Sequence, residues 1–509
     1  MTSSTIPKRS VFLGVADEIS VAVERHFWLF AALFLVLFLV SAIAIDLRTK
    51  LWIDELYTVY TSRQASPREI VKATLEGCDS QPPLYAMIVH AISPWVRHEA
   101  LAVRLPSTLG YCGMVLFLLA FSRRRFSAVY AMVAALLACN AFLGYSTEGR
   151  SYGVVLGCAA GALLCWQTAA DGRRRVLAVP LLAFFLALMT AMHYYSIFFL
   201  VPLFAAEMVR WRKSGKLDFV VLAAMTAPAL LVLGLHYPLI ASAKPFQEHF
   251  WSPAAWDQIP ELYLSYFQKI CLLPLVLLAV FSTTPGGGAK SASLTLPEWV
   301  ATGAFCLMPL CVVFLSIYTT HTFVPRYTFW VVPGMALLIT ALLWAAAPGK
   351  TALGVSMLGL LVALIAWGVL DGLRQKPVLR EAEAVRQELA ALPDGPEPVV
   401  VANAHVFMEL SYDSAPPLRE RLVYPVRRNL DLSYLGFDTD ALNMSALSYR
   451  TKLHIFDYGV VITAYPRFVL AAKPGDYLIG HLLKAGFRVV PIGSFRVPWL
   501  YEVEAPTRK

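Results

Sequence analysis

The sequence has little charge for its length. Asp, Glu, Lys and Arg make up 15% of the 509 residues, whereas an ordinary soluble protein carries about 25%. Hydrophobic residues reach 58%, and the mean hydropathy is +0.60. This composition excludes an ordinary soluble protein and predicts an integral membrane protein.

Several other patterns are missing. The eight cysteines lack the spacing of a disulfide framework or metal site. All but Cys78 lie in apolar runs, so we expect small packing residues and no disulfides. No phosphate-binding glycine loop is visible. The net charge is +9, but no basic stripe with interleaved aromatic residues accompanies it, so nucleic acid is not expected as a partner.

Long apolar runs are present instead. The first begins at Phe27 and is followed by no small-residue cleavage site, so a retained span is expected rather than a signal peptide. Such runs predict about eleven membrane spans. They cover residues 27–45, 106–121, 127–145, 152–170, 176–192, 196–209, 219–240, 267–281, 299–318, 329–347 and 352–370.

Short basic loops indicate the orientation. With a cytoplasmic N-terminus, five basic loops all fall on the cytoplasmic side, as the positive-inside rule requires. Their basic residues are Arg123–Arg125, Arg173–Arg175, Arg210 with Arg212, Lys213 and Lys216, Lys290, and Lys350. Counting the apolar run 84–96 as a further span would move the arginine triplets outside. That run has 13 residues, so we expect an interfacial helix there.

The composition changes after residue 370. Residues 371–509 are predicted to form a small α/β domain, and an odd number of spans places it outside the cytoplasm. Its expected elements are a helix at 378–392, a Pro-Asp-Gly-Pro break at 393–396, and strands at 399–401, 459–462 and 488–490. The predicted fold class is thus a polytopic α-helical membrane protein, with residues 1–370 as the membrane domain, a large first outer loop at 46–107, and a C-terminal extracytoplasmic α/β domain.

Polar residues gather on the outer side of this topology. Asp54 and Glu55 follow the first span, and Glu148 and Arg150 form a charged turn between two spans. A charge costs roughly 2.5–3.5 kcal/mol at the centre of a membrane helix, so such charges are usually paired or functional. Pairing of Glu148 with Arg150, or contact with lipid headgroups, is the alternative. His193 ends another span, where a histidine is as often an interfacial residue.

Short motifs in a fixed order resemble the GT-C superfamily of glycosyltransferases. The most similar members are bacterial proteins like protein O-mannosyltransferases and the aminoarabinose transferases of lipid A. The motifs cover roughly residues 27–350. They are the acidic residue after the first span, Gln81-Pro82-Pro83-Leu84-Tyr85, Arg104-Leu105-Pro106-Ser107, the turn from Tyr145 to Tyr152, and Arg326-Tyr327. Gln81 departs from the pattern, because relatives often have His before the two prolines; if that His binds a metal or phosphate, this protein manages without it.

The resemblance implies transfer of a sugar from a polyprenyl-phosphate donor to a glycan, lipid or protein acceptor. The reaction would take place at the periplasmic face of the inner (plasma) membrane. Asp54 is then the catalytic carboxylate and general base, with Glu55 as its neighbour, or as the true base if the register differs by one. Glu148 would orient the acceptor or a metal.

The resemblance also suggests contacts for the donor. Arg150 and Arg326, with His321 or Arg104, would bind its phosphate, because a guanidinium group matches phosphate oxygens. His193 could serve the same site.

Aromatic residues and a metal are further candidates. Tyr85, Trp251 and Trp256 could contact acceptor or sugar, although interfacial Trp is the commoner explanation. Asp54 and Glu148 would hold Mg²⁺ or Mn²⁺ if a metal takes part. We favour metal-independent catalysis, since the phosphate leaving group already carries its charge and arginine can stabilise it.

Two other functions remain as rivals. A transporter or flippase of lipid-linked substrates would also have many spans, but such proteins often show internal repeats. None is visible here, and the polar residues lie in loops at one face. A non-catalytic scaffold would leave Asp54 and Glu148 unexplained.

Overall fold

The computed structural model describes residues 11–282, 293–374, 381–392, 395–492 and 499–506. The predicted features at Lys290, 378–380 and 393–394 lie outside these ranges. Contacts divide the chain into two compact units. The first comprises residues 1–48, 104–237 and 254–374, and the second comprises residues 49–103, 238–253 and 375–509.

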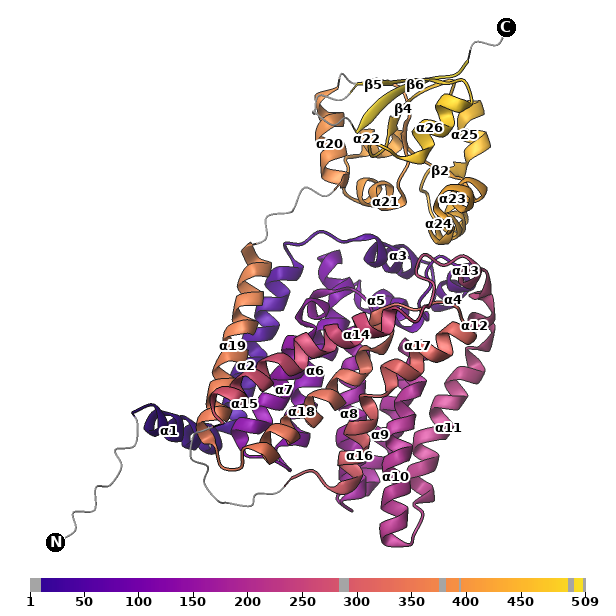
Figure 1. Ribbon diagram of the computed structural model, residues 1–509. Coiled ribbons are helices and arrows are strands. Elements are labelled where there is room, and N and C mark those ends of the chain that lie inside the picture. Colours follow the sequence, from indigo (N-terminus) through magenta and orange to yellow (C-terminus); the bar gives the residue numbers. More distant parts are fainter. Residues whose placement is uncertain (1–10, 283–292, 375–380, 393–394, 493–498, 507–509) are drawn as a thin grey trace, which may run out of the picture. The chain divides into compact units, whose positions relative to one another are not determined.

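The first unit consists of helices, most of which run side by side (Figure 1). They are α1 (Val11–Arg25), α2 (Phe27–Asp46), α6 (Glu99–Ser122), α7 (Ala128–Ala141), η1 (Leu143–Thr147), α8 (Tyr152–Ala170), α9 (Arg175–Met192), η2 (Tyr194–Phe199), α10 (Leu200–Ser214), α11 (Phe219–Leu235), α14 (Gln258–Tyr266), η3 (Phe267–Cys271), α15 (Leu272–Val280), α16 (Leu296–Phe305), α17 (Met308–Tyr318), η4 (Pro325–Val331), α18 (Val332–Ala346) and α19 (Thr351–Arg374).

Each of the eleven predicted spans coincides with helical structure. In the described part of the chain, seven helical segments are long and apolar enough to cross a membrane, and α16 with α17 makes an eighth, bent by 44°. Helices α7, α10 and α11 are shorter, with 14, 15 and 17 residues. The bend has a local cause, because Pro309 lies in the first turn of α17 and cannot donate a backbone hydrogen bond to the helix before it.

Small residues bring α6 and α8 into close contact. A Cβ atom on Gly153 would lie 2.1 Å from the carbonyl oxygen of Ser107, and one on Gly157 would lie 2.4 Å from that of Gly110. Membrane helices commonly pack through such glycines, because backbones can then approach closely. The crossing fixes the start of α8, and with it the charged turn that precedes Tyr152.

The predicted basic loops that contain Arg125, Arg175 and Arg210 meet at one end of this unit, which we call the basic end. Arg125 contacts both Asp171 and Glu298 at 2.8 Å. Arg175 and Arg210 each reach Asp218 at 2.8 Å. Since α8 runs from Tyr152 to Ala170, the turn before Tyr152 lies at the opposite end, which we call the turn end.

The second unit combines the 49–103 segment with the C-terminal α/β domain. Its helices are α3 (Ile53–Ser62), α4 (Pro67–Leu75), α5 (Leu84–Ile92), α12 (Tyr237–Ser242), α13 (Lys244–Glu248), α20 (Glu381–Ala391), α21 (Ala404–Asp413), α22 (Pro416–Arg421), α23 (Arg428–Leu435), α24 (Thr439–Arg450), α25 (Tyr458–Ala464) and α26 (Tyr477–Lys484). Helix α5 has nine residues, too few to span a membrane.

Six strands form one sheet in the order β3-β2-β1-β4-β6-β5. They are β1 (Val399–Val401), β2 (Leu422–Val426), β3 (Ile455–Asp457), β4 (Arg467–Ala471), β5 (Arg488–Pro491) and β6 (Leu500–Glu504). Strands β1 to β4 are parallel, while β6 runs antiparallel to β4 and β5. The core contains Val400, Phe468, Leu470 and Val503. All of β1 is buried, as expected for a central parallel strand.

One predicted strand is wrong. Residues 459–462 lie in α25, although their Gly-Val-Val-Ile sequence favours a strand. The side chain of Asp457 accepts a hydrogen bond from the backbone N–H of Gly459 at 2.8 Å. This cap starts a helix directly after β3 and overrides the propensity of the branched residues. The predictions at 399–401 and 488–490 are confirmed as β1 and β5.

Candidate functional site

The charged turn of the first unit is held by α6. Thr108 donates its hydroxyl to the carbonyl oxygen of Ser146 at 2.8 Å. The hydroxyl of Ser107 accepts from the N–H of Gly153 at 3.2 Å. Within the turn, the N–H of Arg150 donates to the carbonyl oxygen of Glu148 at 2.8 Å. Contacts on both sides of the charged pair therefore fix its backbone.

Three basic residues meet beside this turn, and we call them the cationic cluster: Arg150, His193 and Arg326. Arg150 is 3% exposed and His193 is 8% exposed. The guanidinium carbon of Arg326 lies 5.8 Å from the ring centre of Tyr152, and the His193 ring lies 5.8 Å from the same ring. The turns before α8, after α9 and before α18 thus converge at the turn end.

The surroundings of His193 disfavour its protonated form. Burial first, and then the charges of Arg326 and Arg150, lower the pKa of His193 from 6.5 to about 3. The imidazole is therefore neutral at pH 7.

Two other predicted phosphate contacts have different surroundings. Arg104 is 2% exposed and donates to the carbonyl oxygen of Asp46, at the end of α2, at 3.0 Å. His321 is exposed and has a left-handed backbone, with φ of 56°. Its carbonyl oxygen accepts from the N–H of Ala254 at 3.0 Å. Arg104 joins α2 to α6, and His321 fixes the loop before Arg326.

In helix α3 of the second unit, the two candidate bases differ in burial and in hydrogen bonding. Glu55 is fully buried, and its carboxylate accepts from the N–H of Trp52 at 3.2 Å, which caps the start of the helix. Asp54 is only partly buried. The helix therefore uses Glu55 for its own start, which favours Asp54 as the reactive carboxylate.

Asp79 supports α3, and it was not among the residues predicted for the site. It is 5% exposed, and its carboxylate accepts from the N–H of Gln81 at 3.0 Å and the hydroxyl of Thr58 at 3.4 Å. An aspartate two residues before a backbone donor, just ahead of two prolines, is a turn signal that could have revealed it.

The three predicted aromatic contacts differ in their surroundings. Tyr85 is 1% exposed, and its hydroxyl donates to the carbonyl oxygen of Val103 at 2.7 Å. It therefore packs the interior of the second unit. Trp251 belongs to the second unit and is 49% exposed, while Trp256 belongs to the first and is 52% exposed.

Asp54 and Glu148, the predicted metal ligands, belong to different units. Among the described residues, no group of three or more His, Cys, Asp or Glu side chains could hold a metal ion. All eight cysteines are free.

The fold is that of a polytopic membrane protein with a C-terminal α/β domain, as the sequence predicted. The crystal structure of ArnT from Cupriavidus metallidurans bound to undecaprenyl phosphate is similar, with a TM-score of 0.58 and 13% identity. The match covers 95% of this chain and all of ArnT. The apo state of ArnT gives a TM-score of 0.57 at 14% identity, and the match covers 96% of this chain and 100% of ArnT. No protein-family model matches the sequence, and no significant match is found among curated proteins.

Proposed function

We propose that the protein transfers a sugar from a polyprenyl-phosphate donor to an acceptor hydroxyl at the outer face of the membrane. The observation that carries this proposal is the cationic cluster, in which Arg150 and Arg326 both act on the buried His193. Two arginines present several N–H donors to one phosphate group. The likeness to ArnT bound to undecaprenyl phosphate suggests a lipid phosphate as the anion.

The proposed reaction needs both a carboxylate and cations. Asp54 accepts the proton of the acceptor hydroxyl while the hydroxyl oxygen forms a bond to the anomeric carbon. The bond from that carbon to the phosphate oxygen breaks, and the electron pair leaves with the polyprenyl phosphate. Arg150 and Arg326 stabilise the charge that develops there. Glu148 orients the acceptor from the same turn as Arg150.

The arginines supply the positive charge that this step needs, so we propose a reaction without a metal. The alternative is a Mg²⁺ or Mn²⁺ ion held by Asp54 and Glu148, which would supply Lewis-acid stabilisation of the phosphate. Turnover that persists in EDTA supports the arginine arrangement, and turnover restored only by added Mg²⁺ or Mn²⁺ supports the metal.

The outer face is proposed from the charge distribution. The basic end carries the arginine loops that the positive-inside rule assigns to the cytoplasm. The cationic cluster lies at the other end of α8, which favours the outer side for the donor phosphate. The N-terminus is then cytoplasmic, and the C-terminal domain periplasmic.

Transfer and transport can be separated directly. Purified protein in liposomes receives a panel of undecaprenyl phosphates, each carrying a radiolabelled sugar, together with a membrane extract as the acceptor source. We expect labelled product or released sugar with the wild type, and a loss of about a thousandfold or more with Asp54→Asn, because a general base is removed. Glu55→Gln is the matched control and should retain turnover. Movement of labelled donor across the bilayer, without cleavage, would favour a flippase.

A further inference from the structure

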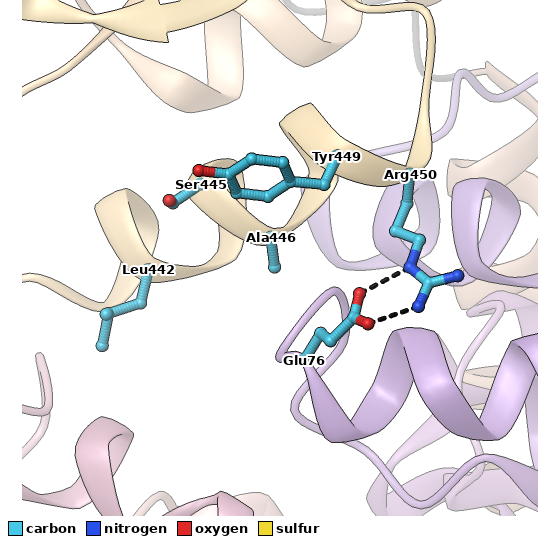
Figure 2. Close-up of a pocket in the computed structure, with 6 residues that line it drawn as sticks. All are labelled: Glu76, Leu442, Ser445, Ala446, Tyr449 and Arg450. Carbon is cyan, nitrogen blue, oxygen red and sulfur yellow. Dashed lines mark hydrogen bonds and ion pairs between the residues drawn. The ribbon is translucent and has the colours of Figure 1, made fainter.

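Helix α24 of the α/β domain holds a turn of the 49–103 segment. Arg450, the last residue of α24, contacts Glu69 at 2.9 Å and also pairs with Glu76 (Figure 2). About two turns earlier on the helix, the side-chain amide of Asn443 donates to the carbonyl oxygen of Gly77 at 2.7 Å. Asn443 is 4% exposed, so this bond is shielded from solvent.

The turn that α24 holds is tightly constrained. Gly77 has φ of +94°, a conformation that other residues rarely adopt. A Cβ atom on Gly77 would also lie 2.6 Å from the ring of Phe246. Glycine therefore suits this position better than any residue with a side chain.

The same turn supports helix α3. Asp79 follows Gly77 by two residues and accepts from the hydroxyl of Thr58 at 3.4 Å. Thr58 lies one helical turn after Asp54, and its hydroxyl oxygen is also 3.4 Å from the carbonyl oxygen of Asp54, so the two acceptors share one hydroxyl hydrogen. A continuous series of contacts therefore runs from α24 through residues 76–79 to the helix that carries Asp54.

We propose that Arg450 and Asn443 are positioning residues for Asp54, acting through the turn at 76–79. This proposal rests on the proposed function for the role of Asp54. In this arrangement the α/β domain fixes the angle at which α3 presents its carboxylate. An error of about 1 Å in such a group can lower turnover a hundredfold.

The ion pair between Arg450 and Glu76 can be replaced without disturbing the packing of the hydrophobic core. A cavity of about 580 Å³ adjoins it, lined by Glu76, Leu442, Ser445, Ala446, Tyr449 and Arg450. Figure 2 shows the Arg450 guanidinium and the Glu76 carboxylate meeting beside this open space. The side chain of Glu76 is 47% exposed and that of Arg450 is 19% exposed, and pairs that reach solvent add little to global stability. Changes at Arg450 should therefore act locally.

The test uses the full-length protein in detergent. The variants are Arg450→Ala with Asn443→Ala, and the charge exchange Arg450→Glu with Glu76→Arg. The matched control is Arg467→Ala on β4, an exposed arginine that pairs with Glu502 of the same domain. Amide hydrogen exchange reports on residues 53–58 and 76–81, and turnover is measured with the labelled donor panel.

In the Ala double variant we expect amide exchange in both segments to rise about fivefold. Turnover should fall about tenfold while KM for the donor stays constant, because an interaction that matters only in the transition state is lost. The charge exchange keeps Asn443 and restores the pair with residue 76 but not the one with Glu69, so it should show smaller effects than the Ala double variant, and Arg467→Ala should show none.

Unchanged amide exchange in the Ala double variant would overturn the proposal. Raised exchange with normal turnover would overturn the positioning role. Raised exchange in a protein whose wild type cleaves no donor would support the contact series and overturn the proposed function instead, so the two failures are distinguishable.

Discussion

Arginines at the two ends of the first unit have opposite surroundings. At the basic end, Arg125 meets the buried carboxylate of Glu298 and Arg175 meets Asp218. At the turn end, Arg150 and Arg326 act on the same buried histidine and lower its pKa. The first arrangement pairs each arginine with a carboxylate, whereas the second places two arginines close enough to one histidine to lower its pKa. Two arginines beside a neutral histidine suit the binding of an external anion, and an arginine–carboxylate pair suits a structural tie.

Two neighbouring acids in α3 also differ in their surroundings. Glu55 and Asp54 are adjacent acids, but Glu55 is buried and caps the helix, whereas Asp54 is partly exposed. Neighbouring charges of one sign can thus have separate roles. The partner and the burial of each charge distinguish them better than its position in the sequence.

The largest expected effect on stability is at the basic end. Arg125→Ala removes a partner from Glu298, which is 2% exposed, and should cost about 3–5 kcal/mol of unfolding free energy. Thermal unfolding in detergent measures it. Arg123→Ala is the control, because Arg123 is 33% exposed and pairs with the exposed Glu24, and it should cost less than about 1 kcal/mol. If both variants lose the same unfolding free energy, the buried ion pair of Arg125 and the exposed ion pair of Arg123 do not differ in their contribution to stability.

An intermediate effect is expected from pH at the turn end. Above pH 6.5, both folded and unfolded chains leave His193 neutral, so its pKa shift contributes nothing. Below pH 6.5 only the unfolded chain takes up the proton, and stability falls until the folded pKa of about 3 is reached. At pH 5 the loss is about 2 kcal/mol.

His193→Gln should remove that loss. The difference in unfolding free energy between pH 7.5 and pH 5 should shrink by about 2 kcal/mol relative to the wild type. His405→Gln is the control, since His405 is 53% exposed, and should leave the difference unchanged. An unaltered pH dependence in His193→Gln would show that the cluster is less positive than the structure indicates.

The smallest effect is expected at α3. Glu55→Gln weakens the bond from the N–H of Trp52 and should cost about 1 kcal/mol of unfolding free energy. Turnover should stay within about threefold of the wild type, since the capping residue takes no part in proton transfer. A loss of turnover comparable to that of Asp54→Asn would make Glu55 the base.

The sequence predicted the helical architecture well because apolar runs and basic loops are local signals. It also predicted that the polar turns of the first unit meet, since alternate loops of a bundle share one end. The convergence of Arg150, His193 and Arg326 follows from that alternation. The bend between α16 and α17 escaped prediction, although Pro309 is its visible cause.

What escaped prediction depends on distant contacts. Arg450 and Glu76 are far apart in the chain, and no local pattern marks them as partners. Asp79 was missed although its turn with Gln81 is a local signal, and its contact with Thr58 becomes apparent only once α3 has formed. The strand predicted at 459–462 was wrong because one capping aspartate outweighed the strand propensity of three branched residues.

The most direct test of the proposed phosphate site is equilibrium binding of undecaprenyl phosphate to the purified protein. Arg326→Ala should raise Kd about 10- to 100-fold, because a hydrogen bond to a charged group contributes about 1.5–3 kcal/mol. Arg326→Lys should fall between that variant and the wild type, and Arg125→Ala should bind like the wild type. If Arg326→Ala binds as tightly as the wild type, the cationic cluster is not the phosphate site and the proposed function loses its main support.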